Sequence, residues 1–184
     1  MTQVPSSTKV GFLKRMVSGM ARSKFSSLLL EKFPWVYDRF HIKMSKEWSS
    51  ELPWAPLKKP ISASRVALVT TGGIILKSQP PFDLNDSNGD CSYRIIPEDA
   101  PLDETVISHL YYDHSDVKID LEVMFPLNTL HRLQHDGKIR SVAPRHFSFQ
   151  GGITNPEPLV RETAPEVARH MKNDQVDLAI LTPA

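Results

Sequence analysis

Six residues near the C-terminus, 176–181, constrain the fold more than any other stretch of the chain. They form a short, largely apolar run that is typical of a parallel strand buried on both faces. Thr182, Pro183 and Ala184 follow it directly. In open α/β sheets, ligands bind outside the carboxyl ends of the strands. The sequence therefore places its last residues where a protein of this class carries its chemistry.

A second apolar run, residues 66–69, precedes the small residues Thr71, Gly72 and Gly73, which predicts a central strand and its exit loop. Further strands are predicted at 93–96, 106–110 and 139–142, and helices at 126–137 and from a capping box at Thr163 to about Asn173. This order favours an α/β fold whose mostly parallel sheet carries helices on both faces. The run at 176–181 is expected to be an inner strand of that sheet.

Charge divides the chain into two parts. Residues 1–60 contain 11 lysines and arginines against 4 aspartates and glutamates, whereas residues 61–184 contain 11 against 17. We therefore expect a basic helical N-terminal arm with a proline-rich connector at 1–60, and an α/β domain at 61–184. The arm can pack on its own domain or on a second subunit, or it can lie on a membrane surface; nucleic-acid binding is the least favoured of these readings.

No apolar run approaches the roughly 18 residues that span a bilayer, and the start lacks a signal-peptide pattern. Cys91 is the only cysteine, so the chain cannot form an internal disulfide. These features predict a protein of the reducing cytoplasm. Cys91 lies in a turn-rich loop, and we expect its replacement by serine to leave the activity of a complete protein unchanged.

The predicted exit loop offers backbone amides that can receive a carboxylate or phosphate, because glycine has no Cβ to block the approach. A tight turn without a ligand explains Thr71, Gly72 and Gly73 equally well. Thr182 follows the neighbouring predicted strand. We expect these four residues to meet at one edge of the sheet and to bind substrate there.

His109 and His114 lie among acidic residues and form the densest polar group in the sequence. Imidazoles beside carboxylates can transfer protons or bind substrate, and they can also serve only as hydrogen-bonded loop residues. A metal site is less favoured, since no further ligand pattern accompanies the pair. Arg145 is a candidate carboxylate clamp and Ser148 a candidate substrate contact, although packing explains both as well. We expect His109, His114, Arg145 or Ser148 to lie near the predicted strand exits.

Five stretches of this chain occur together in one known family. They are TTGG (70–73), KSQPPFD (77–83), HLYYDHSD (109–116), ETAPEVA (162–168) and LTP (181–183). With them, residues 65–184 resemble selenoprotein B of the glycine, betaine, sarcosine and D-proline reductases. The motifs are specific for the family but not for the substrate.

The resemblance implies a subunit of a reductase that cleaves a C–N bond of an amino acid or amino-acid derivative, with a dithiol as electron donor. In this family the Leu-Thr-Pro stretch leads into a selenocysteine or cysteine, and a selenocysteine codon is otherwise a stop codon. We therefore expect the natural product to extend beyond Ala184, and residues 1–184 to lack the nucleophile. The chain itself would hold no cofactor or metal.

The resemblance also implies a small amino-acid-like substrate, a partner subunit that carries a pyruvoyl group and a thioredoxin-like dithiol donor; an oligomer is compatible with it. Two other functions stay open at this point. One is a non-catalytic binding or scaffold relative of the family. The other is a hydrolase or metal enzyme that uses His109 and His114.

Overall fold

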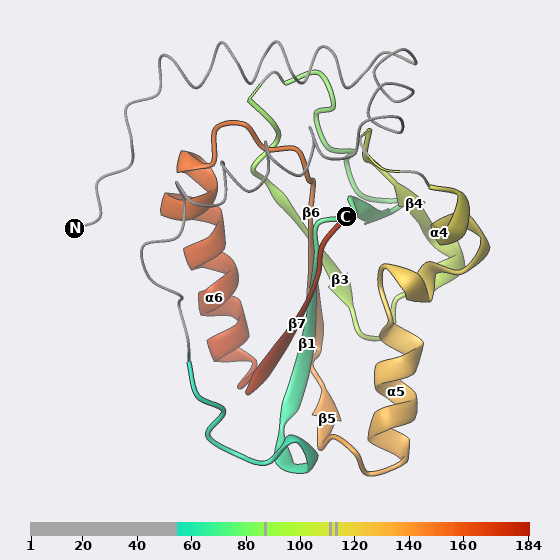
Figure 1. The fold of residues 1–184 in the computed structure, drawn as a ribbon, viewed down its shortest axis with the longest axis vertical. Helices are drawn as coiled ribbons and strands as arrows, with labels where there is room; N and C mark the ends of the chain where they lie inside the picture. Colours follow the sequence, from blue (N-terminus) through green and yellow to red (C-terminus); the bar gives the residue numbers. More distant parts are fainter. Residues whose placement is uncertain (1–54, 87, 111, 113) are drawn as a thin grey trace, which may run out of the picture. The chain divides into compact units, whose positions relative to one another are not determined.

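The structure is a computed structural model that describes residues 55–184 except 87, 111 and 113 (Figure 1). The chain divides into two compact units, Met1–Pro56 and Leu57–Ala184, and the described residues belong almost entirely to the second. The predicted basic arm therefore lies largely outside the described residues. In the part of the chain that is described, no helix is both long and apolar enough to cross a membrane.

The second unit is built around one central strand. β1 (Arg65–Thr70) pairs in parallel with β7 (Leu178–Thr182) on one side, and with β5 (Ser141–Val142) and then β6 (Arg145–Phe149) on the other. β3 (Tyr93–Pro97) pairs antiparallel with β6 and completes the sheet. The prediction of a mixed α/β fold with a mostly parallel sheet is confirmed.

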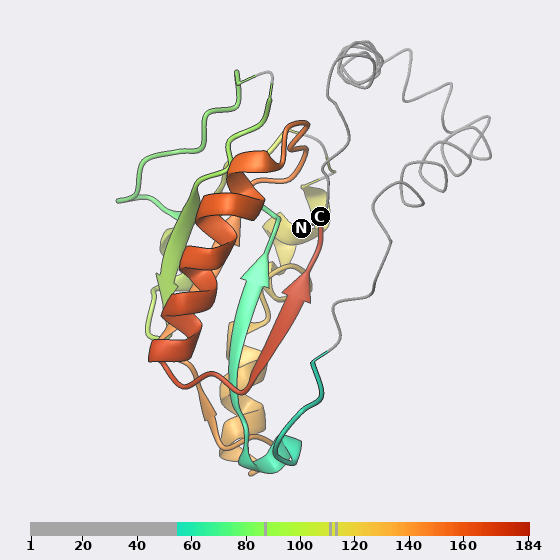
Figure 2. The same cartoon turned by 90° about the vertical axis from the view of Figure 1, so that its left-hand side faces the viewer.

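The central position of β1 follows from its sequence, whereas the position of β7 does not. Val66, Ala67 and Leu68 are at most 1% exposed, as expected of a strand covered on both faces. Among the described strands, β7 pairs with β1 alone and lies at the edge of the sheet opposite β3 (Figure 2). Leu181 on β7 is 70% exposed. The prediction that 176–181 form an inner strand is therefore wrong, because an apolar run of this length does not specify whether one or two neighbours flank it.

Helices α5 (Leu127–His135) and α6 (Ala164–Asn173) lie on opposite faces of the sheet (Figure 1). The alternation of side chains along β1 and β6 supplies an apolar surface to each helix. The cluster on the α5 side includes Val66, Leu68, Phe125, Leu127 and Leu130. The cluster on the α6 side includes Phe147, Phe149 and Val167, with Met171 packed against them.

Both helices end in the same hydrogen-bonding arrangement. After α5, Gly137 takes a φ of 67° and Lys138 N–H donates to Leu133 O at 2.8 Å, which satisfies a terminal carbonyl group of the helix. After α6, Gln175 takes a φ of 56° and Val176 N–H donates to the carbonyl oxygen of Met171 at 2.9 Å. The predicted helix ends at Gly137 and near Asn173 are confirmed.

The start of α6 differs from the prediction. A π-helical turn, η4 (Leu159–Thr163), runs directly into α6. Thr163 has a helical φ of −75° and its side chain makes no capping hydrogen bond. The predicted capping box is therefore wrong, because Thr163 lies inside a longer helical segment and its amide is not at a free helix end.

A two-stranded antiparallel sheet of β2 (Ile74–Leu76) and β4 (Thr105–Ile107) accompanies the main sheet. The strand predicted at 106–110 thus forms only in its first part. The other short elements are η1 (Ile61–Ala63), η2 (Leu102–Glu104), α4 (Ser115–Ile119) and η3 (Leu121–Val123).

A histidine side chain fills a gap in the parallel ladder. β5 and β6 together line one edge of β1, but Pro144 interrupts them, and there Leu68 N–H donates to His146 Nδ1 at 2.9 Å. Because Nδ1 accepts, the imidazole is neutral with its proton on Nε2. His146 is fully buried, and this burial, with a smaller effect from His131, lowers its pKa to about 4.

Replacement of His146 therefore tests the ladder. His146→Leu leaves the buried Leu68 N–H without an acceptor and should lower the free energy of unfolding by about 1–3 kcal/mol at neutral pH. His146→Gln retains an acceptor and should cost less. Urea unfolding of the two variants measures the difference, and His135→Gln, whose side chain is 89% exposed in the native protein, is the control.

The lowered pKa of His146 also predicts that the free energy of unfolding depends on pH. The folded pKa of His146 lies near 4, below the ordinary value of 6.5, so the unfolded chain binds this proton first as the pH falls. The contribution to stability is therefore complete above about pH 6.5 and is lost between about pH 6.5 and pH 4. His146→Gln should flatten this decline. An unchanged decline would contradict the assignment of a buried, neutral imidazole.

Candidate functional site

The carboxyl ends of β1, β6 and β7 meet at one end of the sheet, here called the rim. Thr71 N–H donates to Thr182 O at 3.1 Å, and Gly73 N–H donates to Phe149 O at 2.9 Å. Ala184 N–H donates to Thr71 Oγ1 at 2.9 Å. The structure thus brings together the loop and the strand end that the sequence predicted to be neighbours, and direct hydrogen bonds join them.

The amides of the exit loop are already paired. Besides the two bonds just described, Gly72 N–H donates to Thr70 Oγ1 at 3.0 Å. The Thr70 side chain is buried and donates in turn to Thr182 O at 3.2 Å. An anion that used these amides would have to displace internal acceptors. Binding of a carboxylate by this loop stays a prediction.

The two glycines of the loop are required by space and by conformation. Gly73 has a φ of 65°, and a Cβ there would lie 2.5 Å from Ser108 O. A Cβ on Gly72 would lie 2.5 Å from Cγ of Met124. A side chain at either position would push the loop away from its supports.

His109, Tyr112 and His114 form a group of packed rings behind this loop. The ring centroids of Tyr112 lie 4.8 Å from those of His109 and 4.4 Å from those of His114. Tyr112 OH donates to Gly72 O at 3.0 Å, which anchors the group to the exit loop. A Cβ on Gly151, which follows β6, would lie 2.5 Å from His109 Nε2. The two candidate histidines therefore lie beside the rim, as predicted.

Burial determines the charge of His109. His109 is only 4% exposed. Desolvation, with a smaller effect from His114, lowers its pKa to about 4. Burial also raises the pKa of Tyr112. At neutral pH the group thus offers a neutral imidazole and a neutral phenol, which donate and accept hydrogen bonds without net charge. His114 is less buried than His109 as a residue, but its Nε2 is also buried and has no hydrogen-bond partner among the described residues.

Ser148 lies beneath the rim and not on its surface. It is fully buried on β6, in register with Thr70 on β1. Its Oγ has no hydrogen-bond partner among the described residues. Direct contact of Ser148 with a substrate would require the loop above it to open.

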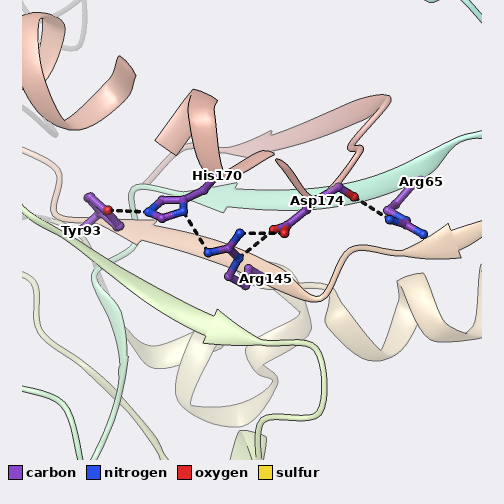
Figure 3. Close-up of polar contacts among 5 residues, drawn as sticks. All are labelled: Arg65, Tyr93, Arg145, His170 and Asp174. Carbon is purple, nitrogen blue, oxygen red and sulfur yellow. Dashed lines mark hydrogen bonds and ion pairs between the residues drawn. The ribbon is translucent and has the colours of Figure 1, made fainter. Parts of the chain in front are cut away.

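Arg145 is not brought to the rim. It begins β6, at the opposite end of the sheet, where its guanidinium makes two hydrogen bonds to the Asp174 carboxylate at 2.7 and 2.8 Å (Figure 3). It also donates to His170 Nδ1 at 2.9 Å, and Asp174 O accepts from Arg65 at 2.6 Å. Of the four residues expected near the strand exits, Arg145 is therefore not there, because the start of a parallel strand and its exit are at opposite ends.

Cys91 precedes β3, and its Sγ lies 3.5 Å from Asn155 O and 3.8 Å from Gly89 O. Burial, followed by the charges of nearby carboxylates that include Asp90, raises the pKa of the thiol. A raised pKa lowers the thiolate fraction, and the thiolate is the reactive form. This environment disfavours Cys91 as a nucleophile.

The structure adds three residues to the site that were not among the predicted site residues. Tyr112 holds the exit loop, Gly151 makes room for His109, and Met124 closes against Gly72. Tyr112 and Gly151 have a sequence signal: an aromatic ring with a hydroxyl lies between the two histidines, and paired glycines after a strand indicate a close approach of backbone and side chain. Among the described residues, no group of three or more His, Cys, Asp or Glu side chains is arranged to hold a metal ion.

Alanine substitutions of glycine test how tightly the rim is packed. Gly73→Ala meets both a positive φ and the Ser108 carbonyl, whereas Gly137→Ala meets a similar φ of 67° with nothing within 4 Å. Each should lose roughly 1 kcal/mol to backbone strain. Gly73→Ala should lose more because of the contact with Ser108. Thermal and urea unfolding measure both variants, and equal losses would show that the loop yields to the added methyl group.

Comparison with known proteins gives the site its context. The family described as glycine/sarcosine/betaine reductase selenoprotein B matches residues 19–184. The chain is 38% identical over 129 residues to D-proline reductase subunit gamma of Acetoanaerobium sticklandii, which covers 70% of this chain and 52% of that protein. No solved structure matches.

More distant relatives belong to a second complex. The chain is 26% identical over 133 residues to glycine reductase complex component B subunit gamma of Symbiobacterium thermophilum, covering 71% of this chain and 31% of that protein. The corresponding subunit of Carboxydothermus hydrogenoformans is also 26% identical over 133 residues, with 71% and 30% covered. The chain thus spans about half or less of the length of these relatives. With a family match over most of its length, the chain belongs to the glycine/sarcosine/betaine reductase selenoprotein B family.

Proposed function

We propose that this chain is part of a reductase subunit that cleaves a C–N bond of an amino acid or amino-acid derivative. The observation that carries the proposal is the rim, where the exits of three parallel strands and two histidines meet in a member of a reductase family. Ligands of open α/β sheets bind at such an edge.

The reaction needs two electrons and two protons for each bond that is broken. A dithiol supplies both when it becomes a disulfide. The C–N bond of the substrate is replaced by an N–H bond of the amine and a C–H bond of the reduced carbon. The dithiol is a thioredoxin-like donor, and such a donor operates in the reducing cytoplasm.

The nucleophile comes from outside residues 1–184 in this proposal. Cys91 is the only thiol in the sequence, and its pKa is raised. A selenolate or low-pKa thiolate is the stronger nucleophile because it is ionised at neutral pH. The resemblance of the chain to the family implies that a pyruvoyl group on a partner subunit activates the substrate amine.

The residues of the rim prepare the place where this chemistry happens. Tyr112 and the glycines fix the exit loop beside Thr182, so the loop does not have to become ordered during the reaction. His114, the less buried of the two histidines, exchanges a proton with the leaving amine. His109 stays neutral behind it, because its pKa is about 4. Its packed ring helps to position the loop.

One observation favours the second candidate, a non-catalytic binding or scaffold relative. All three amides of the exit loop, those of Thr71, Gly72 and Gly73, donate to internal acceptors, as they would in a purely structural turn. A scaffold of this kind would bind the same partner subunit and would release no amine.

Dithiol-dependent amine release distinguishes the two. Two proteins are assayed with the partner subunit on D-proline, glycine, sarcosine and betaine. One is the 184-residue chain, and the other is the polypeptide that is expressed from its own gene, here called the locus product. We expect the 184-residue chain alone to be inactive and the locus product to act on one of the four substrates.

Two variants of the active product refine the assignment. His114→Gln should lower kcat by about 10²-fold or more, as expected for loss of a general acid, with little change in KM. Cys91→Ser should have no effect. Partner binding without amine release by any form would support the scaffold, and loss of turnover in Cys91→Ser would move the redox site to the loop before β3.

A further inference from the structure

The loop before β3 contains an asparagine that is followed directly by a glycine, Asn88-Gly89. The backbone nitrogen that follows an asparagine can attack the carbonyl carbon of its side chain, and glycine has no Cβ to shield that nitrogen. Asn88 is exposed, and its hydrogen bonds in the described part of the chain use its backbone groups. The side-chain amide of Asn88 can therefore turn toward the nitrogen of Gly89.

Two of the other asparagines are protected by the residue that follows them. Asn155 precedes Pro156, whose nitrogen carries no proton and cannot attack. Asn85 lies in the same loop as Asn88 and precedes Asp86. The side chain of Asp86 shields its own nitrogen, and its negative charge opposes the loss of the amide proton that the attack requires.

The remaining two asparagines are protected by helices. Asn128 lies in α5, and the next amide, that of Thr129, donates to Glu122 Oε2 at 2.8 Å. Asn173 ends α6, and the amide of Asp174 donates at 2.9 Å to the carbonyl oxygen four residues earlier. A helix holds both the backbone and the attacking nitrogen in place. Of the five asparagines in the sequence, Asn88 is thus the exposed one with an unshielded nitrogen beside it.

One hydrogen bond restrains the nitrogen of Gly89. Its N–H donates to Asp86 O at 3.1 Å in a turn, and Gly89 takes a φ of 85°. A single turn hydrogen bond in an exposed loop opens locally at small cost in free energy. Attack on the Asn88 side chain therefore needs a local opening of this loop and leaves the core intact.

We propose that Asn88 is a site of spontaneous deamidation, and that the modification releases this loop from the segment that follows β6. The nitrogen of Gly89 bonds to Cγ of Asn88 and loses its proton, and the side-chain nitrogen leaves as ammonia. Solvent water then opens the cyclic imide at either of its two carbonyl carbons, which gives aspartate or isoaspartate. One water is consumed, one ammonia is released, and nothing is oxidised or reduced.

The isoaspartate product does not fit the native contacts of the loop. Asn88 O accepts from Thr154 N–H at 2.8 Å and from Asn155 N–H at 3.1 Å, which ties the loop to the segment after β6. Gly89 is packed against the same segment, since a Cβ there would lie 2.6 Å from Ile153 Cα. Isoaspartate adds one carbon to the main chain between these two contacts, so both cannot be kept.

Cys91 is a natural reporter of this release. Its Sγ lies 3.8 Å from Gly89 O and 3.5 Å from Asn155 O, so the thiol bridges the two segments that should separate. Burial raises its pKa in the native loop. Release exposes the thiol and raises its thiolate fraction, and the thiolate is the form that reacts with thiol reagents.

Incubation of the whole 184-residue chain in mildly alkaline buffer without denaturant tests the site. Mass spectrometry of its peptides measures the loss of the side-chain amide and the formation of isoaspartate at each asparagine. We expect Asn88 to lose its amide at least about tenfold faster than Asn85, because only Asn88 precedes a residue without a Cβ. This comparison within the native chain needs no variant and does not depend on the reductase assignment.

A thiol reagent tests the release. The modified chain should react at Cys91 at least about threefold faster than the fresh chain. Asn88→Gln is the matched control: it keeps a side-chain amide but would have to close a larger ring, so both its amide and the reactivity of Cys91 should persist. Amide loss that is no faster than at Asn85, or that occurs only in urea, overturns the site. Complete modification with unchanged reactivity of Cys91 overturns the release.

Discussion

The parallel pairing of β1 with β7 is the interaction on which the rest of the unit depends. Five consecutive residues of each strand lie in register, and the pair ends where Thr71 N–H meets Thr182 O. Parallel strands bring their carboxyl ends to the same edge, so this single pairing joins two segments that are far apart in the sequence. β1 can serve as the shared neighbour because both of its faces are covered, one by the α5 side of the core and one by the α6 side.

The two ends of the sheet are stabilised by different means. At the amino ends of the strands, Arg145 and Asp174 form an ion pair (Figure 3). His170 on α6 hydrogen-bonds to Arg145 through Nδ1 and to the Tyr93 hydroxyl through Nε2, which extends the network to β3. The guanidinium can only donate, so Nδ1 of His170 is the acceptor of this hydrogen bond. This network fixes the end of α6 just before β7 begins. At the carboxyl ends, uncharged hydrogen bonds and close glycine packing hold the exit loop instead.

This division suits the proposed function, in which the nucleophile comes from outside residues 1–184. The rim is ordered by Tyr112, Met124 and Gly151, and the buried histidine beside it carries no charge at neutral pH. Such an edge can receive a charged nucleophile and a charged substrate without a competing fixed charge from His109. The chain belongs to the reductase family and spans about half the length of its D-proline reductase relative, so the assignment of the rim as the site rests on the geometry.

The sequence by itself determined the elements and their class: the apolar run before Thr71, the helix that Gly137 ends, and the meeting of Thr71 with Thr182, because periodicity and parallel pairing are local or nearly local properties. The family was also readable from its motifs. Only the tertiary structure decided that Arg145 lies away from the rim, that β7 is an edge strand, and that Tyr112 and Gly151 belong to the site. Those facts depend on which strands become neighbours and on which atoms then come within contact distance, and neither is encoded in the spacing of residues along the chain.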